Sequence, residues 1–186
     1  MEVGVTKSIY LIRHCKAEGQ EPDAKLTREG LEQVDLLADF LAPKQIDYIV
    51  SSTYLRAIAT IQPTALQRGL MINTDTRLCE RVLSKENYSG WQEKLLETFY
   101  KPEMRLPGGE SSKEAMERGI SVLNDLIKMP QKHIAVITHG NLLCLMLRYF
   151  DERYGFKEWE SMSNPDVFEI TLVQEKTEVS IQRIWK

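Results

Sequence analysis

Short β-favouring runs of apolar residues alternate along the chain with longer segments whose apolar residues recur at helical spacing. Residues 8–13 (SIYLIR) predict a strand, and residues 26–43 (LTREGLEQVDLLADFLAP) predict a helix after a polar loop. Thr27 is the expected N-cap of this helix, and Leu31 opens its row of apolar residues. The first unit is therefore a strand, a loop and a helix.

The same unit then repeats. Residues 45–52 (QIDYIVSS) predict a second strand, and residues 53–69 (TYLRAIATIQPTALQRG) predict a helix that is kinked or broken near Pro63 and closed by Gly69. Residues 70–76 (LMINTDT) predict a third, short strand. Strands and helices therefore alternate through the first half of the chain.

Residues 78–110 lose clear periodicity, apart from an amphipathic piece at residues 91–100 (WQEKLLETFY), and we interpret this region as a lid or specificity loop. Beyond it, Ser111 or Ser112 caps a predicted helix, and Glu114 is placed for a capping box. The remaining predicted elements are that helix at residues 111–129, a buried strand at 133–140 that runs into a helix at 141–150, and alternating terminal segments at 166–174 and 178–186.

This order of elements predicts an α/β fold with three α/β/α layers around a mostly parallel central sheet, ending in an antiparallel hairpin or edge. The length of 186 residues predicts one domain over residues 1–186, with a variable loop region at about 78–110. An exposed edge of the terminal hairpin could pair with a second copy, so a homodimer is an open expectation. Ligands of such sheets gather at the carboxyl ends of the parallel strands.

Composition and charge limit the classes of partner that we expect for this protein. Lys and Arg number 24 against 27 Asp and Glu, a net charge of −3, so we expect no nucleic-acid partner. No run approaches 18 continuous apolar residues, and the first residues show no basic leader with an apolar core, so we expect no membrane span and no signal peptide. The three cysteines are odd in number and far apart, which is typical of reduced thiols. The predicted location is the cytoplasm.

Arginine and histidine residues follow three of the predicted strands. Arg13 and His14 follow the first strand, Arg56 follows the second, and His139 follows the fourth. Because the overall charge is negative, affinity for an anion has to come from a few converging cations such as these.

Cys15 raises the alternative of a thiolate nucleophile beside His14. A cysteine phosphatase needs an arginine after five intervening residues, but Glu21 stands there, and its carboxylate would repel a phosphate dianion. A zinc site is also disfavoured, because adjacent residues of an extended chain point to opposite sides. We therefore predict that Cys15 is a small residue in a tightly packed place.

Six short motifs in the same order resemble those of the histidine phosphatase superfamily, which has the phosphoglycerate-mutase-like fold. Two positions depart from the family pattern: Cys15 replaces the glycine after the first histidine, and Gln20 replaces an asparagine that often contacts phosphate. The motifs are LIRHCKAE (11–18), LTREGLEQ (26–33), SSTYLRAIAT (51–60), RLCE (77–80), PGGES (107–111) and VITHGNLL (136–143).

The resemblance implies a cofactor-independent phosphatase that hydrolyses a small phosphomonoester. His14 would take the phosphoryl group as a phosphohistidine, and its other ring nitrogen would bond a backbone carbonyl. Arg13, Arg56 and a protonated His139 would hold the phosphoryl oxygens. Glu80 would protonate the leaving group and then activate water.

Other assignments stay open in the sequence. Glu86 and Glu110 are alternatives to Glu80, Gln20 is either a phosphate contact or a solvated amide, and Ser51 resembles a residue that supports the pocket. A phosphoglycerate-mutase-type phosphoryl transfer is the alternative reaction, although mutases of this family carry longer insertions. A catalytically silent phosphate-binding module is the third hypothesis. Tyr88 and Trp91 either pack the variable region or contact substrate. The basic residues near this region either favour a second anionic group on the substrate, as in a phosphorylated acid or sugar bisphosphate, or are solvated loop charges; they are Arg81, Lys85 and Arg105.

Overall fold

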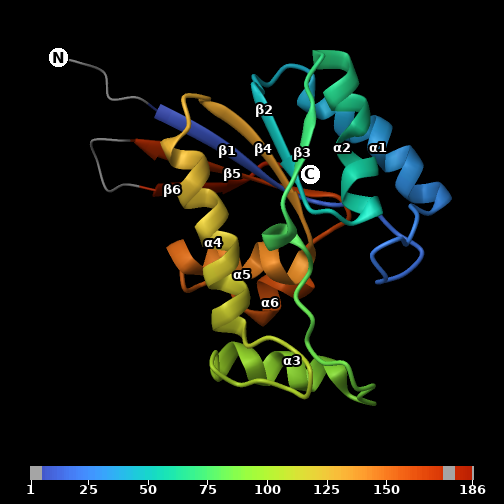
Figure 1. The fold of residues 1–186 in the computed structure, drawn as a ribbon, viewed down its shortest axis with the longest axis vertical. Helices are drawn as coiled ribbons and strands as arrows, with labels where there is room; N and C mark the ends of the chain where they lie inside the picture. The colour runs from blue at the N-terminus through green and yellow to red at the C-terminus, as the bar shows by residue number, and fades with distance from the viewer. Residues whose placement is uncertain (1–5, 174–178, 186) are drawn as a thin grey trace.

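The computed structural model describes residues 6–173 and 179–185, and it forms a six-stranded sheet with helices on both faces (Figure 1). The strands are β1 (Thr6–Arg13), β2 (Tyr48–Ser51), β3 (Ile72–Thr74), β4 (His133–Thr138), β5 (Asp166–Val173) and β6 (Val179–Arg183). Their order across the sheet is β3-β2-β4-β1-β5-β6. The first four are mutually parallel, whereas β5 and β6 are antiparallel additions. The predicted fold class, with its antiparallel edge, is confirmed.

Alternation along the central strands explains the layers. In β1, Ile9 and Leu11 enter one apolar core, while Tyr10 and Ile12 enter the other. The first core contains α4 and α5, and the second contains α1 and α2. The helices are α1 (Arg28–Leu41), α2 (Leu55–Arg68), α3 (Trp91–Tyr100), α4 (Ser112–Lys128), α5 (Gly140–Phe150) and α6 (Phe156–Glu160), with a single 3₁₀ turn at Thr76–Leu78.

Local contacts set several helix ends as predicted. The Thr27 hydroxyl accepts a hydrogen bond from the Gly30 amide at 2.9 Å, and Ser111 and Glu114 form the reciprocal capping box of α4. The Gly69 residue that ends α2 has a φ of +64°, in the left-handed region that favours glycine. The two terminal strands are also present, and the residues that join them, 174–178, lie outside the described residues.

One helix position was predicted wrongly, and two further helix details come from the structure. Leu31 was expected to face the core but is 58% exposed, because Gly30 takes the inward position one turn before Val34. A Cβ at residue 30 would clash with the Lys16 carbonyl oxygen. Pro63 does not break α2, which continues to Arg68. The five-residue helix α6 was not predicted, because it is too short to show periodicity.

The variable region 78–110 leaves the sheet and carries α3 at the far end of the molecule, beyond α5 and α6 (Figure 1). No helix within residues 6–173 and 179–185 is both long and apolar enough to cross a membrane.

Candidate active site

The carboxyl ends of β1, β2 and β4 meet at one edge of the sheet. Because β4 lies between the other two, the residues that follow the three strands become neighbours. The ring centroids of His14 and His139 are 5.0 Å apart. Arg56 donates from Nε to Nε2 of His14 at 3.1 Å. The structure therefore brings these three predicted site residues together.

The hydrogen bonds of His14 define its tautomer. The Arg56 Nε can only donate, so His14 Nε2 is the accepting, unprotonated nitrogen. The proton then lies on Nδ1, which donates to the Cys15 carbonyl oxygen at 2.6 Å. Burial lowers the pKa of His14 to about 3; the Cys15 carbonyl opposes this shift and the guanidinium of Arg56 reinforces it. At neutral pH His14 is uncharged and has a fixed lone pair on Nε2.

His139 is fully buried and is contacted by residues that follow β2. Its Nε2 lies 2.7 Å from the Ser52 hydroxyl, and the ring of Tyr54 packs edge-on against it with 4.9 Å between centroids. Within the described residues, Nδ1 of His139 has no hydrogen-bond partner. Burial, followed by the nearby His14 and Arg56, lowers the pKa of His139 well below its usual value. This shift favours the uncharged ring at neutral pH.

The two arginines keep donors that no described residue satisfies. Arg56 is completely buried, and its Nη1 donates to the backbone oxygens of Gln20 and Glu21 at 3.1 and 2.8 Å. Arg13 donates from Nη1 to the Met162 carbonyl oxygen at 2.9 Å. In the described part of the chain, Nη2 of Arg56 and Nε of Arg13 are buried without a partner. Two guanidinium groups with unmet N–H donors form a ready site for an anion.

Gly140 lets Arg13 approach the start of α5. A Cβ at residue 140 would lie 2.9 Å from both Cζ and Nε of Arg13, closer than carbon atoms normally approach. The guanidinium of Arg13 therefore lies directly against the backbone of the helix start.

Cys15 is buried in the core between the sheet and the helices α1 and α2. Its amide donates to the Thr60 hydroxyl at 2.9 Å, and burial raises the pKa of its thiol to about 12. A thiolate at Cys15 is thus disfavoured. The side chain that replaces the usual glycine lies within the core.

Glu80 sits at the N-terminus of α5. Its carboxyl oxygens accept hydrogen bonds from the amides of Asn141 and Leu142 at 3.1 and 3.0 Å. Of the alternative carboxylates, Glu110 accepts two hydrogen bonds from the Arg118 guanidinium, at 2.7 and 2.8 Å. Among the candidates for the general acid, Glu80 is therefore the one that accepts hydrogen bonds from the start of the helix that follows His139.

A cavity of about 880 Å³ opens beside these residues and is lined by Arg13, Gln20 and Glu80. The Gln20 side chain is exposed at this cavity, while its backbone oxygen holds Arg56. The other lining residues are Tyr54, Arg81, Val82, Leu83, Ser84, Glu86, Asn87, Tyr88, Trp91, Leu95, Asn141 and Trp159. Residues of the variable region thus form one wall of the cavity.

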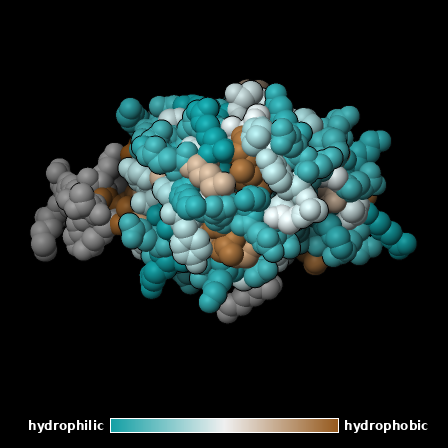
Figure 2. Space-filling view, turned by 90° about the horizontal axis from the view of Figure 1, so that it is seen from below, coloured by the Kyte–Doolittle hydropathy of each residue, from teal (hydrophilic) through white to brown (hydrophobic). Residues whose placement is uncertain are grey.

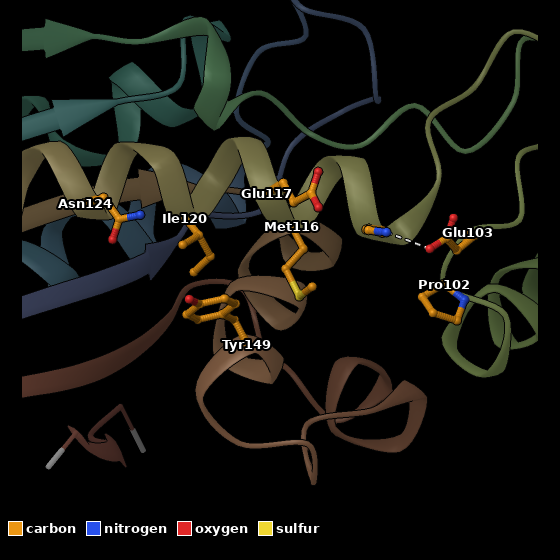
Figure 3. Close-up of a pocket in the computed structure, with 8 residues that line it drawn as sticks. Pro102, Glu103, Met116, Glu117, Ile120, Asn124 and Tyr149 are labelled. Carbon is orange, nitrogen blue, oxygen red and sulfur yellow. Dashed lines mark hydrogen bonds and ion pairs between the residues drawn. The ribbon is translucent and has the colours of Figure 1, made fainter. Parts of the chain in front are cut away.

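A second, open pocket of about 480 Å³ lies against α4 (Figure 3). Met116, Ile120 and Tyr149 supply its apolar surface, and Lys113 pairs with Glu103 at 2.6 Å. Among residues 6–173 and 179–185, no group of three His, Cys, Asp or Glu side chains is placed to hold a metal ion.

Sequence reasoning missed several supporting residues. It selected Ser51, whose hydroxyl bonds the Ser52 carbonyl at 2.9 Å, whereas Ser52 holds His139. Adjacent residues point to opposite sides of a strand, so a choice between two serines needs the register. Asn164 donates to the His14 carbonyl oxygen at 2.7 Å from 150 residues away, and no local pattern signals this contact.

Comparison with known proteins gives consistent matches. A family model described as "Histidine phosphatase superfamily (branch 1)" matches residues 9–183. "Probable phosphoglycerate mutase GpmB" of Salmonella choleraesuis is 29% identical over 157 residues, 74% of this chain and 72% of that protein. "Putative phosphoserine phosphatase 2" of Hydrogenobacter thermophilus is 30% identical over 154 residues, 74% of this chain and 75% of that protein.

Solved structures share the fold. A mycobacterial glucosyl-3-phosphoglycerate phosphatase has a TM-score of 0.76 at 19% identity, with 96% of this chain and 98% of that chain covered. A phosphoglycerate mutase from Bacillus anthracis has a TM-score of 0.77 at 15% identity, with 98% and 94% covered. The names of these proteins are divided between phosphatase and mutase.

Proposed function

The chain belongs to the histidine phosphatase superfamily (branch 1), and we propose that it hydrolyses small phosphomonoesters through a phosphohistidine on His14. One observation supports this role above all others. His14 is buried and uncharged, and it is fixed between the Cys15 carbonyl and Arg56 with its lone pair on Nε2. A neutral imidazole with a fixed lone pair is the nucleophile that attack on phosphorus requires.

In the first step, Nε2 of His14 attacks phosphorus and the bond from phosphorus to the leaving oxygen breaks. The unmet donors of Arg13 and Arg56 hold the phosphoryl oxygens while charge redistributes. Glu80 gives its proton to the departing alkoxide. The Cys15 carbonyl accepts from Nδ1–H and stabilises the positive charge that develops on the ring.

In the second step, the Glu80 carboxylate removes a proton from water, the resulting hydroxide attacks phosphorus, and the bond to Nε2 breaks. Phosphate leaves, and His14 and Glu80 return to their starting forms. A bound phosphate dianion favours the charged form of His139, because an opposite charge in contact raises the pKa of an imidazole. Substrate binding would therefore favour the uptake of a proton by His139.

A mutase is the second candidate, since the Salmonella relative carries that name. In a mutase the phosphoryl group on His14 returns to another hydroxyl of the bound molecule. In a phosphatase it passes to water.

Rapid quenching after mixing with ³²P-labelled p-nitrophenyl phosphate tests the proposal. We expect an acid-labile label on the protein and steady release of labelled phosphate. His14→Ala should abolish the label, whereas Cys15→Ser should keep most of it. Label that moves to an added alcohol or phosphoglycerate in preference to water would indicate a mutase, and an enzyme that never becomes labelled would indicate a binding module.

A further inference from the structure

The cavity beside the anion site has an aromatic wall. Tyr88 lies in the loop before α3, Trp91 and Leu95 lie in α3, and Trp159 lies in α6. The ring centroids of Trp91 and Trp159 are 6.0 Å apart and their planes meet at 85°. Viewed from the end that carries α3, hydrophobic side chains occupy small areas within a mostly hydrophilic surface (Figure 2). A flat apolar group that enters the cavity would cover this wall.

The same wall offers no cation for a second acidic group. Among the described residues that line the cavity, the cations are Arg13 and Arg81. The Arg81 guanidinium is buried and already donates to the Glu110 carbonyl and to the hydroxyls of Thr98 and Ser112, at 2.9 to 3.1 Å. Once Arg13 holds the reacting phosphoryl group, a carboxylate or second phosphate in the cavity would find no unengaged guanidinium among these residues.

The neighbouring charges do not change this picture. Glu86 adds a negative charge at the rim of the cavity. Arg105 pairs with Glu114, and the methylene groups of Lys85 pack against Gly108. Of the three basic residues that the sequence suggested for a second anionic group, Arg81 and Arg105 are therefore already paired, and Lys85 is exposed and does not line the cavity.

Asn141 is the polar exception in the cavity. It lines the cavity and is only 7% exposed, yet neither its Oδ1 nor its Nδ2 has a partner within the described part of the chain. Its amide N–H holds Glu80, so the side chain lies next to the proposed acid. A buried amide with both ends unmet is costly unless a ligand group both donates to it and accepts from it. A hydroxyl or a carboxamide on the leaving group fits that requirement.

We infer that the preferred substrates are phosphomonoesters whose alcohol part carries an uncharged ring with a hydroxyl or amide group. This inference rests on the proposed phosphatase activity and names its substrate class. The ring contacts Trp91 and Trp159, and the polar group pairs with Asn141. Compact substrates with a second acidic group, such as phosphorylated acids and bisphosphates, are poor substrates on this account.

Four phosphates of primary alcohols test the inference with leaving groups of similar basicity: ethyl, benzyl, 3-carbamoylbenzyl and 3-carboxybenzyl phosphate. The last two have nearly the same shape and differ in charge. We expect kcat/KM to be at least about tenfold higher for benzyl than for ethyl phosphate, and at least about tenfold higher for the carbamoyl than for the carboxy compound.

Variants locate the source of the preference. Trp91→Ala should lower kcat/KM for benzyl phosphate about tenfold, mainly through KM, and lower that for ethyl phosphate less. The matched control is Tyr100→Ala, which removes an exposed aromatic residue from the same helix. Asn141→Ala should reduce the advantage of carbamoylbenzyl over benzyl phosphate about tenfold, whereas Asn124→Ala on the exposed surface of α4 should not.

The outcomes separate the two proposals. If all four compounds are hydrolysed but the carboxy compound matches or exceeds the carbamoyl compound, the inference fails and the phosphatase proposal stands. If Asn141→Ala kept the same preference for carbamoylbenzyl over benzyl phosphate, water alone would satisfy this amide. That result would also overturn the pairing of the substrate with Asn141. If none of the four is hydrolysed, the phosphatase proposal itself fails.

Discussion

The substitution Gly140→Ala tests whether displacing Arg13 lowers activity while the stability of the fold is kept. The new Cβ would start 2.9 Å from Cζ and Nε of Arg13, and non-bonded carbon atoms prefer about 3.5–4.0 Å. The guanidinium therefore has to move by somewhat less than about 1 Å, which disturbs its bond to the Met162 carbonyl. Displacements of about 1 Å at a reacting centre cost about 10² in rate.

Stability should respond differently. The clashing atoms belong to the end of a flexible side chain, and alanine is a better helix former than glycine by about 1 kcal/mol. We therefore expect the free energy of unfolding in urea to stay within about 1 kcal/mol of wild type, while kcat/KM for a simple phosphomonoester falls by about 10². Gly155→Ala is the control, because its Cβ would meet its nearest neighbour at 3.5 Å. A fully active Gly140→Ala enzyme would refute a catalytic position for Arg13.

Three further predictions follow from the two histidines. Ser52→Ala should lower kcat/KM about tenfold by freeing His139, whereas Ser51→Ala should change it little, as steady-state assays will show. Phosphate binding near pH 7 should take up protons, because the free site lowers the pKa of His139; titration calorimetry in two buffers of different ionisation enthalpy measures this uptake. Stability should fall as pH drops from about 6.5 towards 3, since unfolded histidines protonate there and buried His14 does not. The free energy of unfolding, measured in urea melts at several pH values, should change less with pH in His14→Gln, by up to about 1.4 kcal/mol per pH unit.

The sequence predicted best those features that adjacent residues determine. The Thr27 cap and the Ser111–Glu114 box depend on contacts within one helical turn, and both are present. His14 and His139 could be assigned to one edge because each follows a parallel strand, whatever the strand order.

Features that depend on the tertiary structure were less predictable. The inward position of Gly30 depends on the loop that crosses α1, and the contact of Asn164 with His14 joins opposite ends of the chain. The charge of His139 depends on burial, which no local pattern reveals. The contact of Trp91 with Trp159 joins two separate helices. Cytoplasmic location and pairing of two copies through the sheet edge stay predictions.

The most direct measurement is ³¹P NMR of the phosphoenzyme trapped by alkaline quenching, combined with peptide mapping. Because Arg56 and the Cys15 carbonyl leave the His14 lone pair on Nε2, the account predicts a phosphoryl group on that nitrogen. A phosphoryl group on Nδ1, on the sulfur of Cys15 or on another residue would contradict it.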